Sequence, residues 1–287
     1  MAVVINTNIS SIAASRSLRD ASSSLTEAME RLSSGKRING AKDDAAGMTV
    51  VTRMKAQISS LNQAVRNAND AISMISTFDG AADEIETIMV RMRELATLAQ
   101  NTTYTKEDQA NANLEFKQLS AEIDRIQQKT KFNGTLDISS AGTAQTYSFQ
   151  VGFGANEAVS IAFASLEAKT LFVSDIASTT IGIGGHDTVA SNVSKAQTAA
   201  DAIDVGLKNL NSGRAVAGAM INRLEHTVSN LMNVIQRTEE ARSRIEDADF
   251  ATESASLARA NVLTQAGSAM LAQANQAPMY VLTLLRG

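Results

Sequence analysis

The sequence of 287 residues has no cysteine, no tryptophan, a single proline at Pro278, and only 4% aromatic residues. Without cysteine, the chain cannot form a disulfide framework, a thiolate metal site or a cysteine nucleophile. Aromatic residues contribute strongly to the cores of globular enzymes, so their scarcity argues against an ordinary enzyme core. Because proline breaks helix interiors, a chain with so little proline is expected to lie in long helices.

Features that would indicate a cofactor, a nucleic acid or a membrane are also scarce. The two histidines, His186 and His226, are not part of an HExxH motif, so we expect no metal site and no cofactor. The net charge of -4 argues against nucleic acid as the main partner. No stretch approaches the roughly 18 apolar residues of a membrane span. The first ten residues, MAVVINTNIS, lack the basic start and apolar run of a secretory signal, so export would need another route.

The dominant pattern that is present is a heptad stripe through residues 44–100. Its aliphatic residues recur in alternate steps of four and three, which places them on one face of a helix. The stripe slips by one position at Asp79-Gly80, which predicts a local phase change in one long helix or, alternatively, a break there. The stripe consists of Met54, Ile58, Leu61, Val65, Ala68, Ile72 and Ile75, then Ala82, Ile85, Met89, Met92, Ala96 and Ala99.

Two further helices are predicted by similar stripes. Thr105 and Asp108 have the spacing of a capping box, and the helix that they begin should end near Asn133-Gly134. The third stripe skips Arg214, and its helix should reach about residue 245. The two stripes consist of Ala112, Phe116, Leu119, Ile123 and Ile126, and of Ala196, Ala200, Ile203, Leu207, Leu210, Ala217, Ile221, Leu224, Val228, Leu231 and Ile235.

Residues 142–190 are richer in glycine, threonine, serine and β-branched residues. Alternating apolar residues at 147–151 and 159–163, with turn residues between them, predict a hairpin. Residues 174–190 fit either a second small β element or a loop. The predicted fold is therefore mainly α: a long coiled-coil-like helical bundle built from both chain halves, with a small central β-hairpin region.

The helices predicted at the two ends, about 6–33 and 250–284, differ from the middle of the chain. Alanine, serine and glycine occupy many of their apolar positions, so each turn removes little apolar surface from water. We therefore favour an intermolecular role for these weakly apolar helices over an intramolecular pair. The residues expected to support assembly are Leu18, Leu25, Leu32, Leu257, Leu263 and Met270.

Two carboxylate clusters, Asp43-Asp44 and Glu246-Asp247-Asp249, are the best candidates for acid–base or metal chemistry. Each lies where a helix begins or turns, so capping is the favoured role. The glycine run at 182–185 lacks the lysine and the following helix of a phosphate-binding loop. We expect no enzymatic activity and no catalytic residues.

Several longer segments together resemble one known family. The chain opens with MAVVINTNISS, continues with RLSSGKRINGAKDDAAGM and RNANDAIS, and closes with ARSRIEDADFATE and LAQANQAPMYVLTLLR. With these segments the chain resembles bacterial flagellin over roughly residues 1–135 and 195–286. The resemblance implies a subunit that polymerises into the flagellar filament outside the cell through its N- and C-terminal helices. It also implies five parts: filament-core helix 1–41, rod helices 42–135, variable β-hairpin region 136–194, rod helix 195–246 and filament-core helix 247–287.

The resemblance further implies partners. These are other copies of the chain, an export chaperone and the filament cap, with export through the flagellar type III channel. Some flagellins bind the host Toll-like receptor 5, and the matching positions here are Arg91, Leu95 and Glu115. A hook–filament junction protein is the alternative. A flagellin-derived metallopeptidase is a weaker rival, because HExxH is absent and residues 136–194 leave little room for it.

Overall fold

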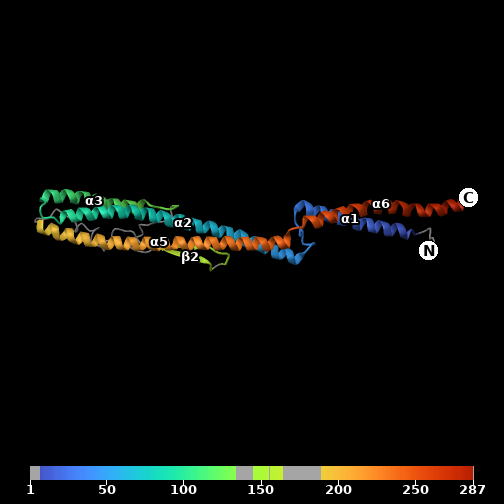
Figure 1. Cartoon of the computed structure of the whole chain (residues 1–287), viewed down its shortest axis with the longest axis horizontal. Coiled ribbons are helices and arrows are strands. Elements are labelled where there is room, and N and C mark those ends of the chain that lie inside the picture. The colour runs from blue at the N-terminus through green and yellow to red at the C-terminus, as the bar shows by residue number, and fades with distance from the viewer. Residues whose placement is uncertain (1–6, 134–144, 155, 164–188, 287) are drawn as a thin grey trace. The chain divides into compact units, whose positions relative to one another are not determined.

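The computed structural model describes residues 7–133, 145–154, 156–163 and 189–286, and these are mainly helical (Figure 1). The contacts divide the chain into a terminal unit, residues 1–58 with 236–287, and a central unit, residues 59–235. The elements are α1 (Ile9–Ser34), α2 (Ala45–Ala99), α3 (Lys106–Lys129), β1 (Gln145–Gln150), β2 (Ala158–Phe163), α5 (Val189–Glu246) and α6 (Phe250–Arg286). The predicted mainly α fold with a small hairpin is confirmed.

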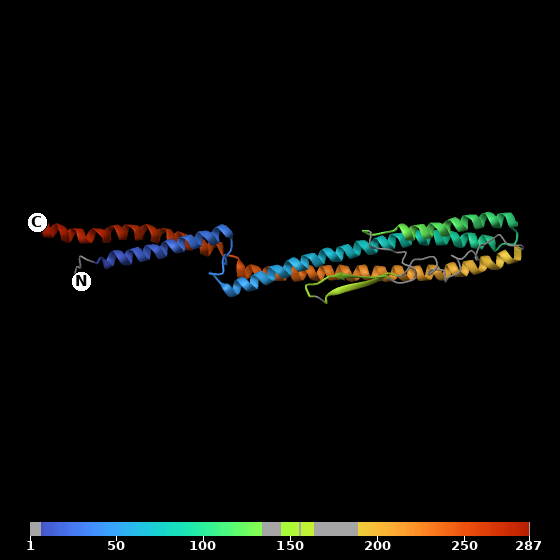
Figure 2. The same ribbon diagram turned by 180° about the vertical axis from the view of Figure 1, so that it is seen from behind.

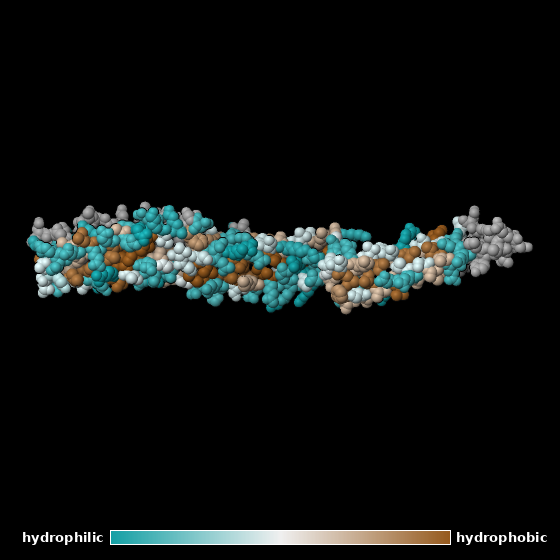
Figure 3. Space-filling model, turned by 90° about the horizontal axis from the view of Figure 1, so that it is seen from above, coloured by the Kyte–Doolittle hydropathy of each residue, from teal (hydrophilic) through white to brown (hydrophobic). Residues whose placement is uncertain are grey.

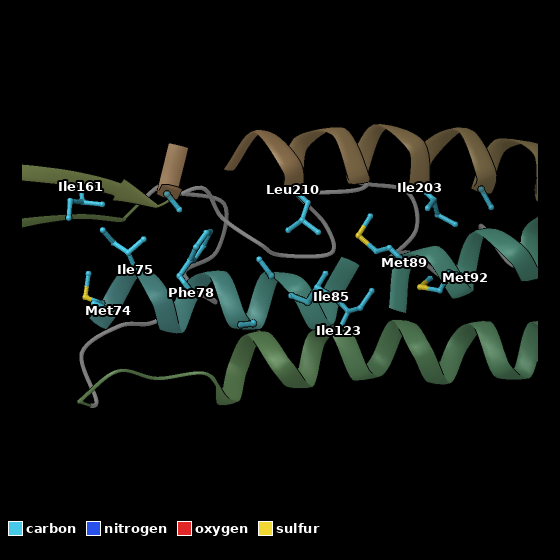
Figure 4. Close-up of a cluster of buried hydrophobic side chains, with 14 of the residues drawn as sticks. Met74, Ile75, Phe78, Ile85, Met89, Met92, Ile123, Ile161, Ile203 and Leu210 are labelled. Carbon is cyan, nitrogen blue, oxygen red and sulfur yellow. The ribbon is translucent and has the colours of Figure 1, made fainter. Parts of the chain in front are cut away.

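Helix α2 is continuous, so the change of stripe at Asp79-Gly80 is a phase change and not a break. In the central unit the stripe of α2 packs against apolar residues of α3, α5 and the hairpin (Figure 4). Heptad spacing thus places one continuous row of α2 side chains in a shared core. The largest fully buried side chains are Phe78, Phe116, Ile75, Ile85, Met89, Met92, Ile123 and Ile161.

The helix boundaries follow local capping signals. The Thr105 hydroxyl accepts a hydrogen bond from the Asp108 backbone amide, and the Asp108 side chain accepts one from the Thr105 backbone, which confirms the predicted capping box. Helix α5 begins at Val189, six residues before the predicted start at 195. Its early turns are held by Asn192, whose buried side chain donates to Gln109 Oε1 at 2.8 Å. Val193 and Val189 continue the stripe backwards from Ala196 in steps of three and four, so the stripe itself extends to this start and the predicted boundary was placed too late.

The two strands form the predicted antiparallel hairpin, with Tyr147 opposite Ile161 and Phe149 opposite Val159. The apolar side chains of one face lie in the central core, where Ile161 is almost fully buried. Asn67 of α2 donates to the Gln150 carbonyl at 2.9 Å and fastens the hairpin to the helices. The prediction for 174–190 lies outside the described residues, apart from 189 and 190, which begin α5.

Candidate assembly interface

Helices α1 and α6 lie side by side in the terminal unit, antiparallel to one another (Figures 1 and 2). At one end Asn8 caps α1 through the Ser11 amide, and its side chain also donates to the Ala274 carbonyl at 2.8 Å. At the other end Arg31 forms an ion pair with Glu253 at 3.1 Å. Polar contacts therefore fix both ends of the pair within one chain.

Small residues build the contact between α1 and α6. The buried hydrophobic residues among the described parts of these two helices are Ala21, Ala28 and Ala260. Gly267 lets α1 approach closely, since a Cβ atom there would lie 3.3 Å from Leu18 Cδ1. Each alanine removes only one methyl group from water, so the pair gains far less than the central core gains from its buried phenylalanine, isoleucine and methionine residues.

The outer surface of this pair exposes large apolar side chains. Seven of them keep more than half of their surface exposed, and α1 and α6 both contribute. Figure 3 shows apolar surface in this part of the molecule, mixed with polar residues. Single exposed apolar side chains are common on protein surfaces, whereas a contiguous apolar patch marks a binding surface, so these side chains are candidates for contact with a partner. The seven residues are Ile9, Ile12, Met29, Phe250, Val262, Leu263 and Met270.

The six predicted assembly residues fall into two groups. Four leucines, at positions 18, 25, 32 and 257, are half-buried, whereas Leu263 and Met270 are exposed. The preference for an intermolecular over an intramolecular pair was wrong for the pairing itself, because α1 and α6 pack together within one chain. Small side chains allow this close approach without burying much apolar surface. The exposed face of the pair is what remains for contact with other copies.

An ionic cluster joins the segment between α1 and α2, helix α2 and the end of α5. The buried carboxylate of Glu246 accepts from Lys55 at 2.6 Å and from Lys36 at 3.2 Å, and Arg242 lies 3.7 Å from its second oxygen. Burial by itself would raise the pKa of Glu246. The hydrogen bonds and charges of Lys55 and Lys36 outweigh burial, so the pKa lies below its usual value. The backbone amide of Arg37 also donates to the Glu246 carbonyl at 2.7 Å. This hydrogen bond connects the segment after α1 with the end of α5.

The remaining acidic residues of the two sequence clusters stabilise turns and helix starts. Asp43 accepts from the amides of Asn39 and Gly40, which lowers the pKa of this carboxyl. Asp44 accepts from the Gly47 amide at 2.8 Å. In the same way the side chain of Asp249 accepts from the start of α6. The predicted capping role is confirmed at these positions, but Glu246 instead serves the ionic cluster, which no sequence spacing indicated.

The three candidate receptor-binding residues do not share one surface. Arg91 of α2 and Glu115 of α3 are both about half exposed and form an ion pair at 2.8 Å. Hydrogen bonds to Glu115 and then to Glu94 raise the pKa of Arg91. Leu95, in contrast, points into the central core and is only 4% exposed. The surface of this region is therefore formed by the charged residues, with Leu95 beneath them.

The described residues contain neither a membrane-spanning helix nor a cluster of metal ligands. No helix there combines the length and the hydrophobicity needed to cross a membrane. Nor do any three histidine or acidic residues of the described parts gather in a way that could hold a metal ion.

Comparison with known proteins identifies the family. The family model of the bacterial flagellin N-terminal helical region matches residues 5–137. The family model of the bacterial flagellin C-terminal helical region matches residues 200–285. A flagellin of Halalkalibacterium halodurans is 43% identical over 99% of this chain and 100% of its own length. The flagellar filament 33 kDa core protein of Treponema phagedenis is 36% identical, also over 99% of this chain and its full length.

Among solved structures, a putative flagellar hook-associated protein from Vibrio parahaemolyticus is similar, with a TM-score of 0.58 over 71% of this chain and all of that chain. At 14% identity this likeness concerns the fold alone. The hook–filament alternative is therefore not favoured over the flagellins that match along their whole length. This chain belongs to the bacterial flagellin family and is a structural subunit of the flagellar filament, not an enzyme.

Proposed function

We propose that the α1–α6 pair assembles the filament by packing its exposed apolar face against the pairs of neighbouring copies. The observation that carries this proposal is the contrast within the pair: alanine and glycine lie inside, whereas seven large apolar side chains lie outside. Each of those side chains is 52–71% exposed, so burying the remainder contributes about 1–2 kcal/mol, and contact between copies adds to the internal contact of the pair. Assembly and ordering of the termini would then be coupled.

The five-part division is part of the same proposal. Residues 1–41 and 247–287 form the filament core, 42–135 and 195–246 form the rod, and 136–194 form a short variable region. The thin contact between α1 and α6 supports export of the unfolded chain through the flagellar type III channel, because little stability is lost on unfolding it. The export chaperone and the filament cap are the expected partners, and the assembled subunit lies outside the cell.

Truncation and charge substitution test the assembly proposal. We expect deletion of residues 1–40 or 250–287 to abolish filaments seen by negative-stain microscopy. Leu263→Glu and Met270→Glu should do the same, because each places a charge on the exposed apolar face. The matched controls Leu263→Met and Met270→Leu keep the face apolar and should polymerise. Filaments from either truncated chain, or from both glutamate variants, would rule out this interface.

We also propose that the Arg91–Glu115 surface binds Toll-like receptor 5, with Leu95 supporting the helices from below. The exposed ion pair between α2 and α3 supports this assignment, because charged side chains already held in place can contact a partner without much ordering cost. Arg91→Ala should reduce receptor activation by the unassembled protein. Arg125→Ala is the control, since it removes a comparable exposed ion pair, with Glu122 on α3. Activation by Arg91→Ala equal to that by the parent would contradict the assignment.

A further inference from the structure

We propose that a cavity in the terminal unit binds a small oxyanion such as inorganic phosphate. The cavity lies between the segment that follows α1 and the first turns of α2, and Lys36, Asn39, Lys55 and Glu246 supply its polar walls. Its volume is about 140 Å³. One water molecule needs only about 10–15 Å³, so a larger polar ligand fits.

The cavity offers hydrogen-bond donors in excess. Asn39 Nδ2 is buried and has no hydrogen-bond partner among the described residues. The ammonium groups of Lys36 and Lys55 both bind one oxygen of Glu246, and each ammonium has three hydrogens to donate. A buried donor without an acceptor costs roughly 1–3 kcal/mol, so the cavity favours a ligand that brings several acceptor oxygens.

The walls offer little acceptor capacity in return. Glu246 Oε1 already receives both lysines, and its second oxygen faces Arg242. The hydroxyl of Thr52, which also lines the cavity, donates to the Met48 carbonyl at 2.8 Å. A water molecule could accept a hydrogen bond from Asn39 Nδ2. It would also bring two donors of its own into a cavity whose walls already have more donors than acceptors. Inorganic phosphate supplies more acceptors than donors.

The charge balance points to the same ligand class. Three cations, Lys36, Lys55 and Arg242, surround Glu246, and Arg242 also pairs with Glu239 at 2.6 Å. These groups together carry three positive and two negative charges. The nearby carboxylates of Asp43 and Asp44 are held by backbone amides of the turn. Among the residues that line the cavity, Lys36 and Lys55 carry two positive charges and Glu246 carries one negative charge, which favours an anion there.

Titration of the dilute, unassembled full-length protein with inorganic phosphate tests the site. Ionic strength is held constant with sodium chloride, and the readouts are the 31P NMR line width and the thermal midpoint. We expect saturable line broadening and a rise in Tm that reaches a plateau. Chloride alone should produce neither effect, because it only screens charge. Such a saturable stabilisation is what binding to the folded state predicts.

Three variants separate the site from general charge effects. Asn39→Asp places a carboxylate beside the lysines, so it should have the higher Tm without phosphate and gain nothing from added phosphate. Lys55→Gln should abolish the line broadening. Lys42→Gln removes the same charge from an exposed lysine of this segment that does not line the cavity, and it should bind as the parent does.

The opposite results would overturn the proposal. These are an unsaturable response, an equal response to chloride, or phosphate binding by Asn39→Asp as strong as that by the parent. Any of them would mean that the cavity holds water only. If Lys55→Gln unfolds the terminal unit, Asn39→Asp still decides the question, because it keeps all three cations around Glu246 and removes no hydrogen bond of the Asn39 side chain among the described residues.

Discussion

Arg214 of α5 lies against Asp79 of α2, with 2.9 Å between Nε and Oδ1, so the polar interruptions of the two heptad stripes face one another. The same guanidinium lies 3.0 Å from Asp83 and also pairs with Glu86. The hydrogen bond to Asp79 is the main cause of a raised pKa of Arg214. A partly exposed polar layer beside the apolar core of the coiled coil penalises other alignments, because shifting the helices would separate the paired charges.

Replacement of Arg214 by alanine should destabilise the central unit by about 1 kcal/mol, because Asp79 and Asp83 are 43% and 65% exposed and solvent weakens their ion pairs. Three carboxylates of α2 would lose their common partner. Urea unfolding followed by circular dichroism measures the change. Arg223→Ala is the control, since Arg223 is an exposed arginine of α5 with no ion pair in the described part of the chain. An unchanged unfolding midpoint for Arg214→Ala would show that the layer contributes nothing.

Alanine in place of Gly80 should stabilise the protein. Gly80 lies inside the continuous helix α2, and a Cβ atom there would meet nothing within 4 Å. Glycine in a helix interior costs roughly 0.5–1 kcal/mol relative to alanine, so Gly80→Ala should raise the free energy of unfolding by about that amount. Thermal unfolding measures it. A lower midpoint would mean that the phase change at this position requires glycine.

Whether a feature could be predicted from the sequence depends on how far apart along the chain the interacting residues lie. The helix through Asp79-Gly80 and the Thr105 capping box were predictable because heptad spacing and capping act within a few residues. The start of α5 was predicted six residues late, although Val189 and Val193 continue its stripe; the buried contact of Asn192 with Gln109, far away in the sequence, is what could not be predicted.

The candidate sites show the same limit more strongly. Lys36 and Lys55 meet Glu246 only after α5 has returned along α2, so no local pattern contains that cluster. Leu95 was placed by resemblance together with Arg91, but the two residues are four apart on α2 and the structure buries one and exposes the other. Spacing places two residues four apart on the same side of a helix. How far each of them is buried depends on the neighbouring helices, which the spacing does not describe.

Gly267→Leu should weaken the contact between α1 and α6. A Cβ atom at this position would already lie 3.3 Å from Leu18 Cδ1 and 3.6 Å from Leu18 Cα, so the larger side chain would force the helices apart. We expect loss of helical circular dichroism from the termini and loss of polymerisation. Gly218→Leu is the control, because Gly218 lies inside α5 with open space around its Cα. Normal polymerisation of Gly267→Leu would contradict the close packing.

Stability of the terminal unit should fall in acid partly through Glu246. Its pKa is lowered in the folded state, because the charges and hydrogen bonds of Lys55 and Lys36 outweigh the effect of burial. The contribution is therefore complete above the unfolded value of about 4.3 and is lost as the pH falls through the lower folded pKa. Glu246→Gln should be less stable than the parent at pH 7, and the difference in Tm should shrink below about pH 4.

Glu225→Gln is the matched control for that titration. Glu225 is exposed on α5, and the described residues include no ion-pair partner for it. Its substitution should leave the Tm close to that of the parent, because it removes no ion pair of the described residues. If the Glu246→Gln difference is constant from pH 7 to pH 3, the ionic cluster does not stabilise the charged form of this residue.

Backbone amides of α1 and α6 should exchange with solvent faster than those of the central core when the protein is dilute and unassembled. Small residues form the contact within the pair, whereas phenylalanine, isoleucine and methionine fill the central core. Local opening of the pair therefore costs less free energy than opening of the core. Hydrogen exchange read by mass spectrometry, on peptides from α6 and from residues 59–99 of α2, measures the difference.

Assembly should then slow exchange in α6, because neighbouring copies cover its exposed apolar side chains. Equal protection of the two regions before assembly would show that one chain suffices to stabilise the termini, and coupling between ordering and polymerisation would have to be abandoned.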